Sequence, residues 1–429
     1  MVSTTPWLLA VLETLTYLGG TQVAWIVLSV AVVWLAIRRE RALAVYVAAT
    51  GLGAAALTTG VKTLVGRPRP IVDSPVTGTS GLSFPSGHSL GSAVTYGVLL
   101  LVFLPVVSPR LRRPVAAAAV LLVIAIGLTR IGLAVHYPSD VLGGWSLAVL
   151  WLIVTAVAFR RWHDKAGLGS PALIEGLQPE EERRLHPAPA NDSLLPAGWH
   201  TVAGLVAGVV LIWGGLVALG LLITEKLAFV ARWDTSVAEW FASIRTELLT
   251  DIFFASSRFG DTRNIVILMV VAVPLAAALT RRWRPPLFLL VAVGGEVLLF
   301  VAAATVVGRS RPAVEHLTPG LPPTSSFPSG HVAATAAAYG AVALLIVAWS
   351  TARVRYGAIV VAVVLALSVA TARLYIGVHH PTDVMASLLY VSVWLAVCWF
   401  VLRPGRPDAT EDRGLRHQER VENDRLGRT

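Results

Sequence analysis

The chain has 429 residues, of which 55% are hydrophobic and 14% are charged, and its mean hydropathy is +0.70. Soluble proteins carry about 25% charged residues, so this composition excludes an ordinary soluble domain. The formal net charge of +10 would suit a nucleic-acid binder. However, the basic residues gather in short loops between apolar runs, which is the positive-inside pattern of membrane proteins. We therefore expect a multi-pass membrane protein with those loops in the cytoplasm and no nucleic-acid partner.

The N-terminal segment MVSTTPWLLAVLETL has neither a basic start nor a small-residue cleavage site, so we expect no cleavable signal peptide. Residues 6–19 mix Trp and Leu with Glu13, which favours an amphipathic helix at the outer interface; a short twelfth span is the alternative. The first half then has apolar runs of spanning length at 21–37, 42–61, 89–106, 114–130 and 139–158.

A polar, Pro-bearing stretch that contains EEERR separates this set from a second one. Residues 232–255 again favour an interfacial amphipathic helix. The second set of apolar runs lies at 200–223, 264–280, 286–307, 332–349, 357–372 and 384–402. The sequence thus predicts eleven spans in two tandem all-α bundles. The predicted organisation is a first membrane domain over 1–162, a cytoplasmic linker over 163–197, a second membrane domain over 198–403 and a charged cytoplasmic tail over 404–429.

The two halves repeat one another at an almost constant offset. Four pairs lie 243 residues apart: His88 with His331, Arg130 with Arg373, His136 with His379 and Asp140 with Asp383. Arg69 and Arg311 are 242 residues apart, and LTYLGGTQ (15–22) matches SSRFGDTR (256–263) at an offset of 241. The additional leading span of the second half, 200–223, gives both copies one orientation, so the repeat is parallel. The single cysteine, Cys398, permits no intrachain disulfide.

Polar residues of the first half collect at the outer ends of the helices. Three cations there, Lys62, Arg69 and Arg130, indicate an anionic ligand. The stretch FPSGH opens a helix, whose first N–H groups bind phosphate-like anions. Imidazole can attack phosphorus, and imidazolium can protonate a leaving oxygen. A carboxylate four residues past His136 can fix the tautomer of that ring. These residues predict a phosphate site with two histidines.

Three motifs carry a resemblance to a known family. They are K-x6-R-P (Lys62 to Pro70), PSGH (Pro85 to His88) and R-x5-H-x3-D (Arg130 to Asp140). They resemble the signature motifs of the type 2 phosphatidic acid phosphatase superfamily. Its members are integral-membrane lipid phosphate phosphatases, related in fold to bacterial acid phosphatases and vanadium haloperoxidases. The resemblance covers each half nearly end to end.

The resemblance implies a role for each matching residue. His136 would be the nucleophile that forms a phosphohistidine, Asp140 would orient it, and His88 would be the general acid. The phosphoryl oxygens would be held by Lys62, Arg69, Ser86, Gly87 and Arg130. The family needs no metal, the sequence shows no metal-ligand cluster, and we expect no cofactor. Thr129 stands where the family often has Ser before the arginine, which keeps the hydroxyl.

The second half matches less completely. Its catalytic set would be His331, His379 and Asp383, and its phosphate-binding set would be Arg311, Ser329, Gly330 and Arg373. The lysine position is Ala304, and loss of such a charge-assisted contact weakens binding by about one to two decades. The second site is either competent, with a different specificity, or degenerate, binding lipid or supporting the fold. Arg309 matches Arg67 and is a partial substitute for the lysine; His316 and His380 are interpreted as surface residues.

The sequence therefore predicts a phosphatase that removes phosphate from a lipid phosphate or pyrophosphate at the extracytoplasmic face of a bacterial plasma membrane. Undecaprenyl or decaprenyl pyrophosphate, phosphatidic acid and phosphatidylglycerol phosphate are the candidate substrates. Two alternatives stay open. A phosphoryl or head-group transferase would use the same histidine. A non-enzymatic transporter or lipid-binding protein would use no catalytic histidine. No pattern indicates an oligomeric state.

Overall fold

The computed structural model describes residues 12, 14–70, 81–163, 176–177, 185–189, 192–318 and 325–406. The chain divides into two compact units, Met1–His186 and Pro187–Thr429. Within the described ranges each unit is built from helices and contains no strand. Most of the predicted linker and nearly all of the predicted tail lie outside the described residues, as does most of the segment 6–19.

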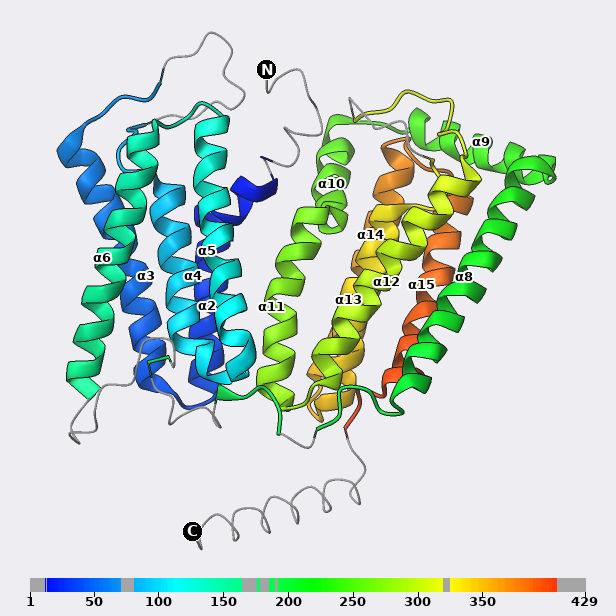
Figure 1. Ribbon diagram of the computed structural model, residues 1–429. Helices are drawn as coiled ribbons and strands as arrows, with labels where there is room; N and C mark the ends of the chain where they lie inside the picture. Colours follow the sequence, from blue (N-terminus) through cyan, green and yellow to red (C-terminus); the bar gives the residue numbers. More distant parts are fainter. Residues whose placement is uncertain are drawn as a thin grey trace, which may run out of the picture. The chain divides into compact units, whose positions relative to one another are not determined.

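The first unit is a bundle of five long helices around α4 (Figure 1). The helices are α2 (Thr21–Ile37), α3 (Arg41–Val65), α4 (Gly87–Phe103), α5 (Pro109–Gly132) and α6 (Pro138–His163). Helix α4 contacts all four others, and its apolar face packs Leu90 and Val94 against Ala54 of α3 and Ala148 of α6. This packing brings the end of α3 and the starts of α4 and α6 together at one end of the bundle.

The second unit repeats this plan around α13 and adds helices before it (Figure 1). The helices are α8 (Trp199–Glu225), α9 (Ala228–Ser243), α10 (Glu247–Ser257), α11 (Thr262–Thr280), α12 (Arg284–Val307), α13 (Gly330–Trp349), α14 (Val354–Tyr375) and α15 (Pro381–Leu402). Helix α8 packs on α12 and α15, and α9 contacts α8, α14 and α15. The predicted amphipathic segment 232–255 is therefore two helices, because the chain turns between Ser243 and Glu247.

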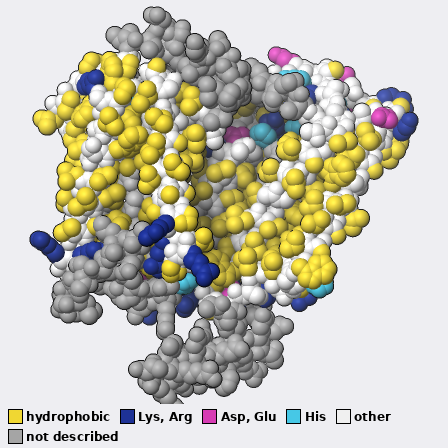
Figure 2. Space-filling model, viewed as in Figure 1, with side chains coloured by type: hydrophobic (Ala, Val, Ile, Leu, Met, Phe, Trp, Pro, Cys, Tyr) yellow, Lys and Arg dark blue, Asp and Glu magenta, His cyan; other side chains and the backbone are white. Residues whose placement is uncertain are grey.

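The flanks of these helices are apolar and exposed, as membrane-spanning helices require. Among the described residues, ten helices are long and apolar enough to cross a bilayer, whereas α2, with 17 residues, is a shorter apolar helix. Large apolar side chains such as Leu121, Leu211 and Phe400 are 65–75% exposed. Figure 2 shows such side chains covering the helix flanks. The chain is a multi-pass membrane protein, and the predicted all-α tandem architecture is confirmed.

All eleven predicted spans are helices, with ends that differ by up to five residues. Helix α3 continues to Val65, so Lys62 lies on its last turn and does not follow the span as predicted. Apolar runs miss such turns because a helix still pairs its backbone where side chains become polar. Gly66 and Gly308, at φ of 64° and 59°, end α3 and α12 in the same left-handed conformation.

The same tryptophan contact, here called a tryptophan clasp, occurs in both units: Trp151 with Thr50 and Gly53, and Trp394 with Ala292 and Gly295. The indole N–H of Trp151 donates to the Thr50 carbonyl at 2.9 Å, and that of Trp394 donates to the Ala292 carbonyl at 2.9 Å. Each ring lies so close to a glycine, Gly53 or Gly295, that an added Cβ would come within 2.1 Å of it. Both tryptophans therefore hold neighbouring helices together in the same way.

Candidate active site

The first site comprises the six predicted side chains Lys62, Arg69, His88, Arg130, His136 and Asp140. His136 lies in the loop between α5 and α6 and is 4% exposed. Its Nδ1 is 3.3 Å from the Ser83 hydroxyl and 3.4 Å from Asp140 Oδ2, while its Nε2 is 3.2 Å from Arg69 Nη1. An arginine can only donate, so Nε2 is the unprotonated nitrogen in this arrangement. The free electron pair of His136 therefore faces a predicted phosphate-binding cation.

Asp140 is fully buried on the first turn of α6 and is held from several sides. Its Oδ2 accepts from the Tyr137 N–H at 2.9 Å and from the Ser83 hydroxyl. Its Oδ1 accepts from Arg67 Nη1 at 2.8 Å, and the Arg67 guanidinium stacks on the Tyr137 ring at 4.1 Å. The carboxylate is thus fixed beside Nδ1 of His136, where it can stabilise a charged ring.

The predicted phosphate-binding residues converge, with one difference in detail. Lys62 Nζ donates to the Leu82 carbonyl at 2.6 Å, and Arg69 donates to the carbonyls of Gly81 and Val135. Ser86 is the N-cap of α4. Its N–H bonds to the Asp140 carbonyl at 3.0 Å, and its hydroxyl bonds to Ser89. The polar atoms of Ser86 are therefore used within the fold. The first backbone N–H groups of α4 that lack a helical partner and can meet an anion are those of Gly87 and His88.

Arg130 and His88 complete the first site from α5 and α4. Arg130 is 4% exposed, and its Nη1 donates to the Thr16 hydroxyl at 2.7 Å. Its buried Nε has no partner among the described residues. An unpaired buried N–H is costly, and an anion would satisfy it. His88 is half-buried and lies within electrostatic range of Arg130, His136, Arg69 and Lys62.

Charge and burial keep His136 neutral. Burial, together with the cations Arg69, Arg130 and Lys62, lowers the pKa of His136 to about 4, and the hydrogen bond to Asp140 opposes this shift. At neutral pH the ring is therefore unprotonated, which is the state that a nucleophile requires.

A groove leads away from the first site along the helices. Its volume is about 180 Å³, and it runs between α2, α3 and α4 from Gly87 and Thr58 to Trp25 and Leu28. The Thr58 methyl is the nearest atom to an imagined Cβ on Gly87, at 3.6 Å. In the second unit the ring of Phe300 comes within 2.9 Å of the same point on Gly330. The space beside the glycine of PSGH is therefore occupied by a side chain in the second unit.

The second site comprises Arg311, His331, Arg373, His379 and Asp383, and it repeats the backbone frame of the first. Arg311 Nη1 donates to the Val378 carbonyl at 3.0 Å. Arg373 Nη1 donates to the Ser257 hydroxyl at 3.2 Å, and its buried Nε has no partner among the described residues. Ser329 and Gly330 again begin a helix, although the Ser329 N–H donates to Ser387 at 2.8 Å and its buried hydroxyl has no described partner. The structure therefore brings together the predicted residues of this site as well.

His379 is held differently from His136. Its Nδ1 is 2.7 Å from the Ser326 carbonyl and 3.8 Å from Asp383 Oδ2. A carbonyl can only accept, so Nδ1 carries the proton and Nε2 is left with its electron pair. Burial lowers the pKa of His379, and Asp383 opposes that shift. This histidine is therefore also neutral, with its electron pair on Nε2.

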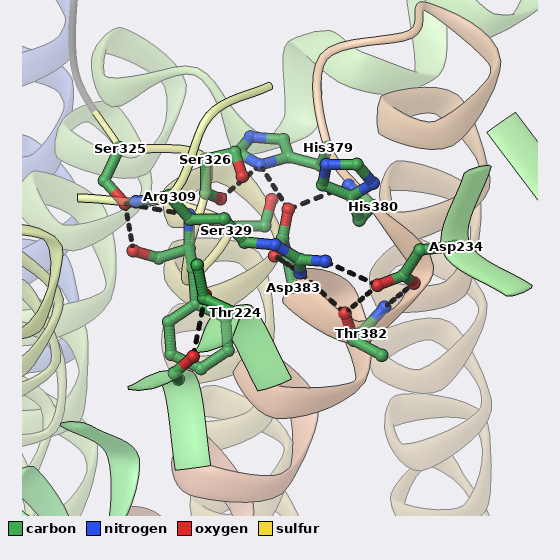
Figure 3. A network of polar contacts seen from close by, with 12 residues as sticks. Thr224, Asp234, Arg309, Ser325, Ser326, Ser329, His379, His380, Thr382 and Asp383 are labelled. Atoms are coloured by element: carbon green, nitrogen blue, oxygen red, sulfur yellow. Dashed lines mark hydrogen bonds and ion pairs between the residues drawn. The ribbon is translucent and has the colours of Figure 1, made fainter. Parts of the chain in front are cut away.

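Arg309 bridges two buried carboxylates in the second unit (Figure 3). Its Nη1 donates to Asp383 Oδ1 at 2.6 Å, and its Nη2 donates to Asp234 Oδ2 at 2.6 Å. Asp234, on α9, also accepts from the N–H and hydroxyl of Thr382. The expectation that Arg309 substitutes for the missing lysine is therefore wrong, because its guanidinium is taken up by carboxylates.

A second carboxylate reaches the second site at the start of α11. Asp261 Oδ1 is 3.3 Å from His331 Nε2. Burial raises the pKa of Asp261, and Arg373 and the exposed Arg258 oppose that shift. The position that matches Asp261 in the first half is Gly20, which has no side chain.

Two further histidines are less exposed than the sequence suggested. His380 and His316 are half-buried, with Nε2 at 3.3 Å from the Ser310 carbonyl and at 3.0 Å from the Pro312 carbonyl. They line the loops that carry Arg311 and His379 and are not simple surface residues. Loop carbonyls need donors, which a nearby imidazole supplies.

Sequence reasoning missed several residues that touch these sites. The hydroxyls of Thr16 and Ser257 accept hydrogen bonds from Arg130 and Arg373, and Ser83 and Ser326 contact the paired histidines of the third motif. A signal existed for these four, because each pair is matched in the repeat: two in the 241-offset segment and two in SFPSGH. Asp234 had no such signal, since no described residue of the first half matches it.

Comparison with known proteins agrees with this arrangement. The PAP2 superfamily model matches the chain twice, over residues 40–164 and 285–405. The chain therefore belongs to the PAP2 superfamily and contains two tandem copies of it, as the motifs predicted.

Three curated relatives are similar to parts of the chain. Phosphatidylglycerophosphatase B of Bacillus subtilis (strain 168) is 40% identical over 80 residues, which are 18% of this chain and 39% of that protein. Lipid A 1-phosphatase of Rhizobium johnstonii is 34% identical over 110 residues, 24% of this chain and 41% of that protein. Lipid A 1-phosphatase of Rhizobium etli is 32% identical over 141 residues, 29% of this chain and 56% of that protein. The chain thus spans 39–56% of the length of these relatives.

A solved structure is also similar. The crystal structure of a transmembrane PAP2 type phosphatidylglycerolphosphate phosphatase from Bacillus subtilis matches with a TM-score of 0.40 and 23% identity. The match covers 44% of this chain and 94% of that one.

Proposed function

We propose that the chain is a lipid phosphate phosphatase whose first site works through a phosphohistidine on His136. The observation that carries this proposal is the orientation of His136. Asp140 and Ser83 hold its Nδ1 side, and its Nε2 faces Arg69. Family membership and the phosphatase names of the relatives support the reaction class.

The reaction takes two steps. His136 Nε2 attacks the phosphorus of a lipid phosphomonoester or pyrophosphate while the bond to the leaving oxygen breaks. His88 gives that oxygen a proton, and Lys62, Arg69 and Arg130 hold the phosphoryl oxygens. Water then attacks the phosphohistidine, His88 takes a proton from the water, and inorganic phosphate and neutral His136 are released. None of these steps uses a metal.

The substrate would be an extracytoplasmic lipid phosphate of a bacterial plasma membrane. The site lies at one end of its helices, and Arg-rich turns such as Arg38–Arg41 lie at the other. The positive-inside rule assigns the Arg-rich end to the cytoplasm. Polyprenyl pyrophosphate, phosphatidic acid and phosphatidylglycerol phosphate all present a terminal phosphate on an apolar tail, which the groove beside Gly87 would accept.

The second site would keep a working nucleophile in His379, with His331 as the acid and Asp383 as the orienting carboxylate. Arg311 and Arg373 would hold the phosphate together with the start of α13. The neutral, oriented ring of His379 supports competence, and the altered charges around it support a different specificity.

The test is phosphate release in detergent over a panel of these lipids by the full chain and by two matched variants. His136→Ala should abolish release from the preferred lipid, because no other group at that site can form the covalent intermediate. His379→Ala should leave that release in place. If His136→Ala keeps the turnover of the native chain, the proposed function is wrong. Trapping of phosphate on the native chain, lost in His136→Ala, would identify the intermediate.

A further inference from the structure

The two sites differ in charge around the histidine that would protonate the leaving group. In the first unit, the position before α2 is Gly20, and His88 has no described carboxylate within ion-pair distance. In the second unit, Asp261 takes that position and lies 3.3 Å from His331. A negative charge therefore stands next to the leaving-group side of the second site only.

The two sites also differ in the number of cations that face the phosphate. Lys62 lies on the last turn of α3 and acts on both His88 and His136. Its counterpart on α12 is Ala304, and Arg309, next along the chain, is held by Asp234 and Asp383. Arg245, another described cation of this region, donates to the carbonyls of Tyr375 and Glu315. Neither Arg309 nor Arg245 thus takes the place of Lys62.

The differences act in one direction. Among the described residues the first site offers Lys62, Arg69 and Arg130 to an anion, and the second offers Arg311 and Arg373 beside the carboxylate of Asp261. Arg258 partly offsets that carboxylate, and water screens both charges in part, because Arg258 is exposed and the Asp261 side chain is 46% exposed. The contact of Asp261 with His331 is nonetheless short, at 3.3 Å, so the loss of one cation and the gain of one anion lower the attraction for a second negative charge on the ligand.

Phosphate groups of lipids come in two charge states. A phosphomonoester has a second pKa of about 6 and is a dianion above neutral pH. A phosphodiester has no second ionisation and stays a monoanion. Esterification also replaces a charged oxygen with a neutral one, which a carboxylate beside it repels less.

We propose that the second site binds a singly charged phosphodiester lipid head group, whereas the first site binds the doubly charged terminal phosphate of a monoester or pyrophosphate. This inference rests on the proposed function in one respect, that the motif residues of both units are phosphate sites. It gives the Asp261–His331 contact a role in selecting the ligand.

The test compares two lipids with the same tails, dioleoyl phosphatidylmethanol and dioleoyl phosphatidic acid, at about pH 8, where the second is mostly a dianion. Binding is measured on the full chain in detergent with Lys62→Ala and Arg69→Ala, which weaken the first site. The unfolding midpoint of this background checks that it is folded. The expected result is about tenfold tighter binding of phosphatidylmethanol, since one unfavourable charge contact is worth about a decade.

Two substitutions give the second site the charges of the first. In the same background, Asp261→Gly and Ala304→Lys should each shift the affinity ratio about tenfold toward phosphatidic acid. The reciprocal change is Gly20→Asp with Lys62→Ala in an otherwise native chain. Gly20 has an extended N-cap conformation that Asp adopts readily, so this change should raise the KM for phosphatidic acid without unfolding the unit.

The proposal is overturned if phosphatidic acid binds the background more tightly, if neither lipid binds, or if both charge substitutions leave the ratio unchanged. These outcomes are independent of catalysis. Should His136→Ala fail to stop phosphate release, the proposed function falls, but the affinity ratio of the second site is measured without turnover and stands or falls separately.

Discussion

The first and second units place a histidine in the same backbone frame but surround it with different charges. The arginine of each R-P motif donates to the residue before the histidine, at 2.9 Å to Val135 and at 3.0 Å to Val378. The Ser83 N–H meets the Arg67 carbonyl at 2.7 Å, and the Ser326 N–H meets the Arg309 carbonyl at 2.8 Å. The comparison teaches that the loop geometry persists in both units, while the side chains that set charge have diverged.

The largest expected effect is on the rate of phosphate release, and it distinguishes Asp140 from Asp383. Asp140→Asn should lower phosphate release by about a thousandfold, because the amide cannot stabilise a charged His136 and can hold the wrong tautomer. Steady-state rates on the preferred monoester measure this. The matched control is Asp383→Asn, which should leave release by the first site unchanged. Equal losses in both variants would mean that the two sites do not act separately.

The ion pairs of Arg309 with Asp234 and Asp383 should make the second unit more sensitive to loss of a carboxylate than the first unit is to loss of Arg67. Asp234→Ala removes one carboxylate from a cation that is 7% exposed and strands the Thr382 donors, so we expect a loss of about 3 kcal/mol. Thermal unfolding of the full chain measures it. Arg67→Ala should cost less, about 1 kcal/mol, because Arg67 is 35% exposed and the Ser83 hydroxyl and the Tyr137 N–H still donate to the buried Asp140 carboxylate. A larger loss from Arg67→Ala would reverse the comparison.

The tryptophan clasps mark where the units are alike. Gly53→Ala and Gly295→Ala each push a Cβ into an indole ring, and overpacking of this kind costs about 1–3 kcal/mol. We expect similar downward shifts of the unfolding midpoint from both changes. Trp151→Phe combined with Gly53→Ala should recover part of the loss, because the smaller ring makes room. A shift from only one of the glycine variants would show that the cores are not equivalent.

The smallest expected effect concerns pH. Burial and Arg69 lower the pKa of His136, so its neutral form persists down to about pH 4. Arg69→Ala removes a cation and should raise that pKa, moving the acid limb of kcat/KM upward by up to about one pH unit. Asp261→Gly, in the other unit, should leave that limb where it is. A downward move in Arg69→Ala would contradict the assignment of His136 as the nucleophile.

Much of the fold and of the first site could be predicted from the sequence. Apolar runs located the eleven spans, and the three motifs brought Lys62, Arg69, His88, Arg130 and His136 to one end of a bundle. The ends of the helices could not be predicted from the apolar runs. Lys62 ends the apolar run of α3 because it is charged, yet the helix continues to Val65.

The carboxylates of the second unit show where prediction stops. Asp234 and Asp261 are single acidic residues in mixed segments, where most such side chains face water. Which partner each one meets depends on distant parts of the chain, because Arg309 lies in the loop after α12 and His331 lies on α13. Tertiary packing decides these two pairs, so they cannot be predicted from the local pattern of polar residues.

The contact of α9 with the repeated helices of the second unit decides where that unit can be cut for separate expression. Asp234 belongs to a helix that precedes the repeated segment, yet it holds Arg309 and Thr382. A gene fragment that begins at residue 256, where the likeness to the first unit starts, would encode every motif residue and still leave the buried guanidinium of Arg309 short of one counter-ion. An expression boundary for the second unit therefore belongs ahead of α8, in the residues that join the two copies.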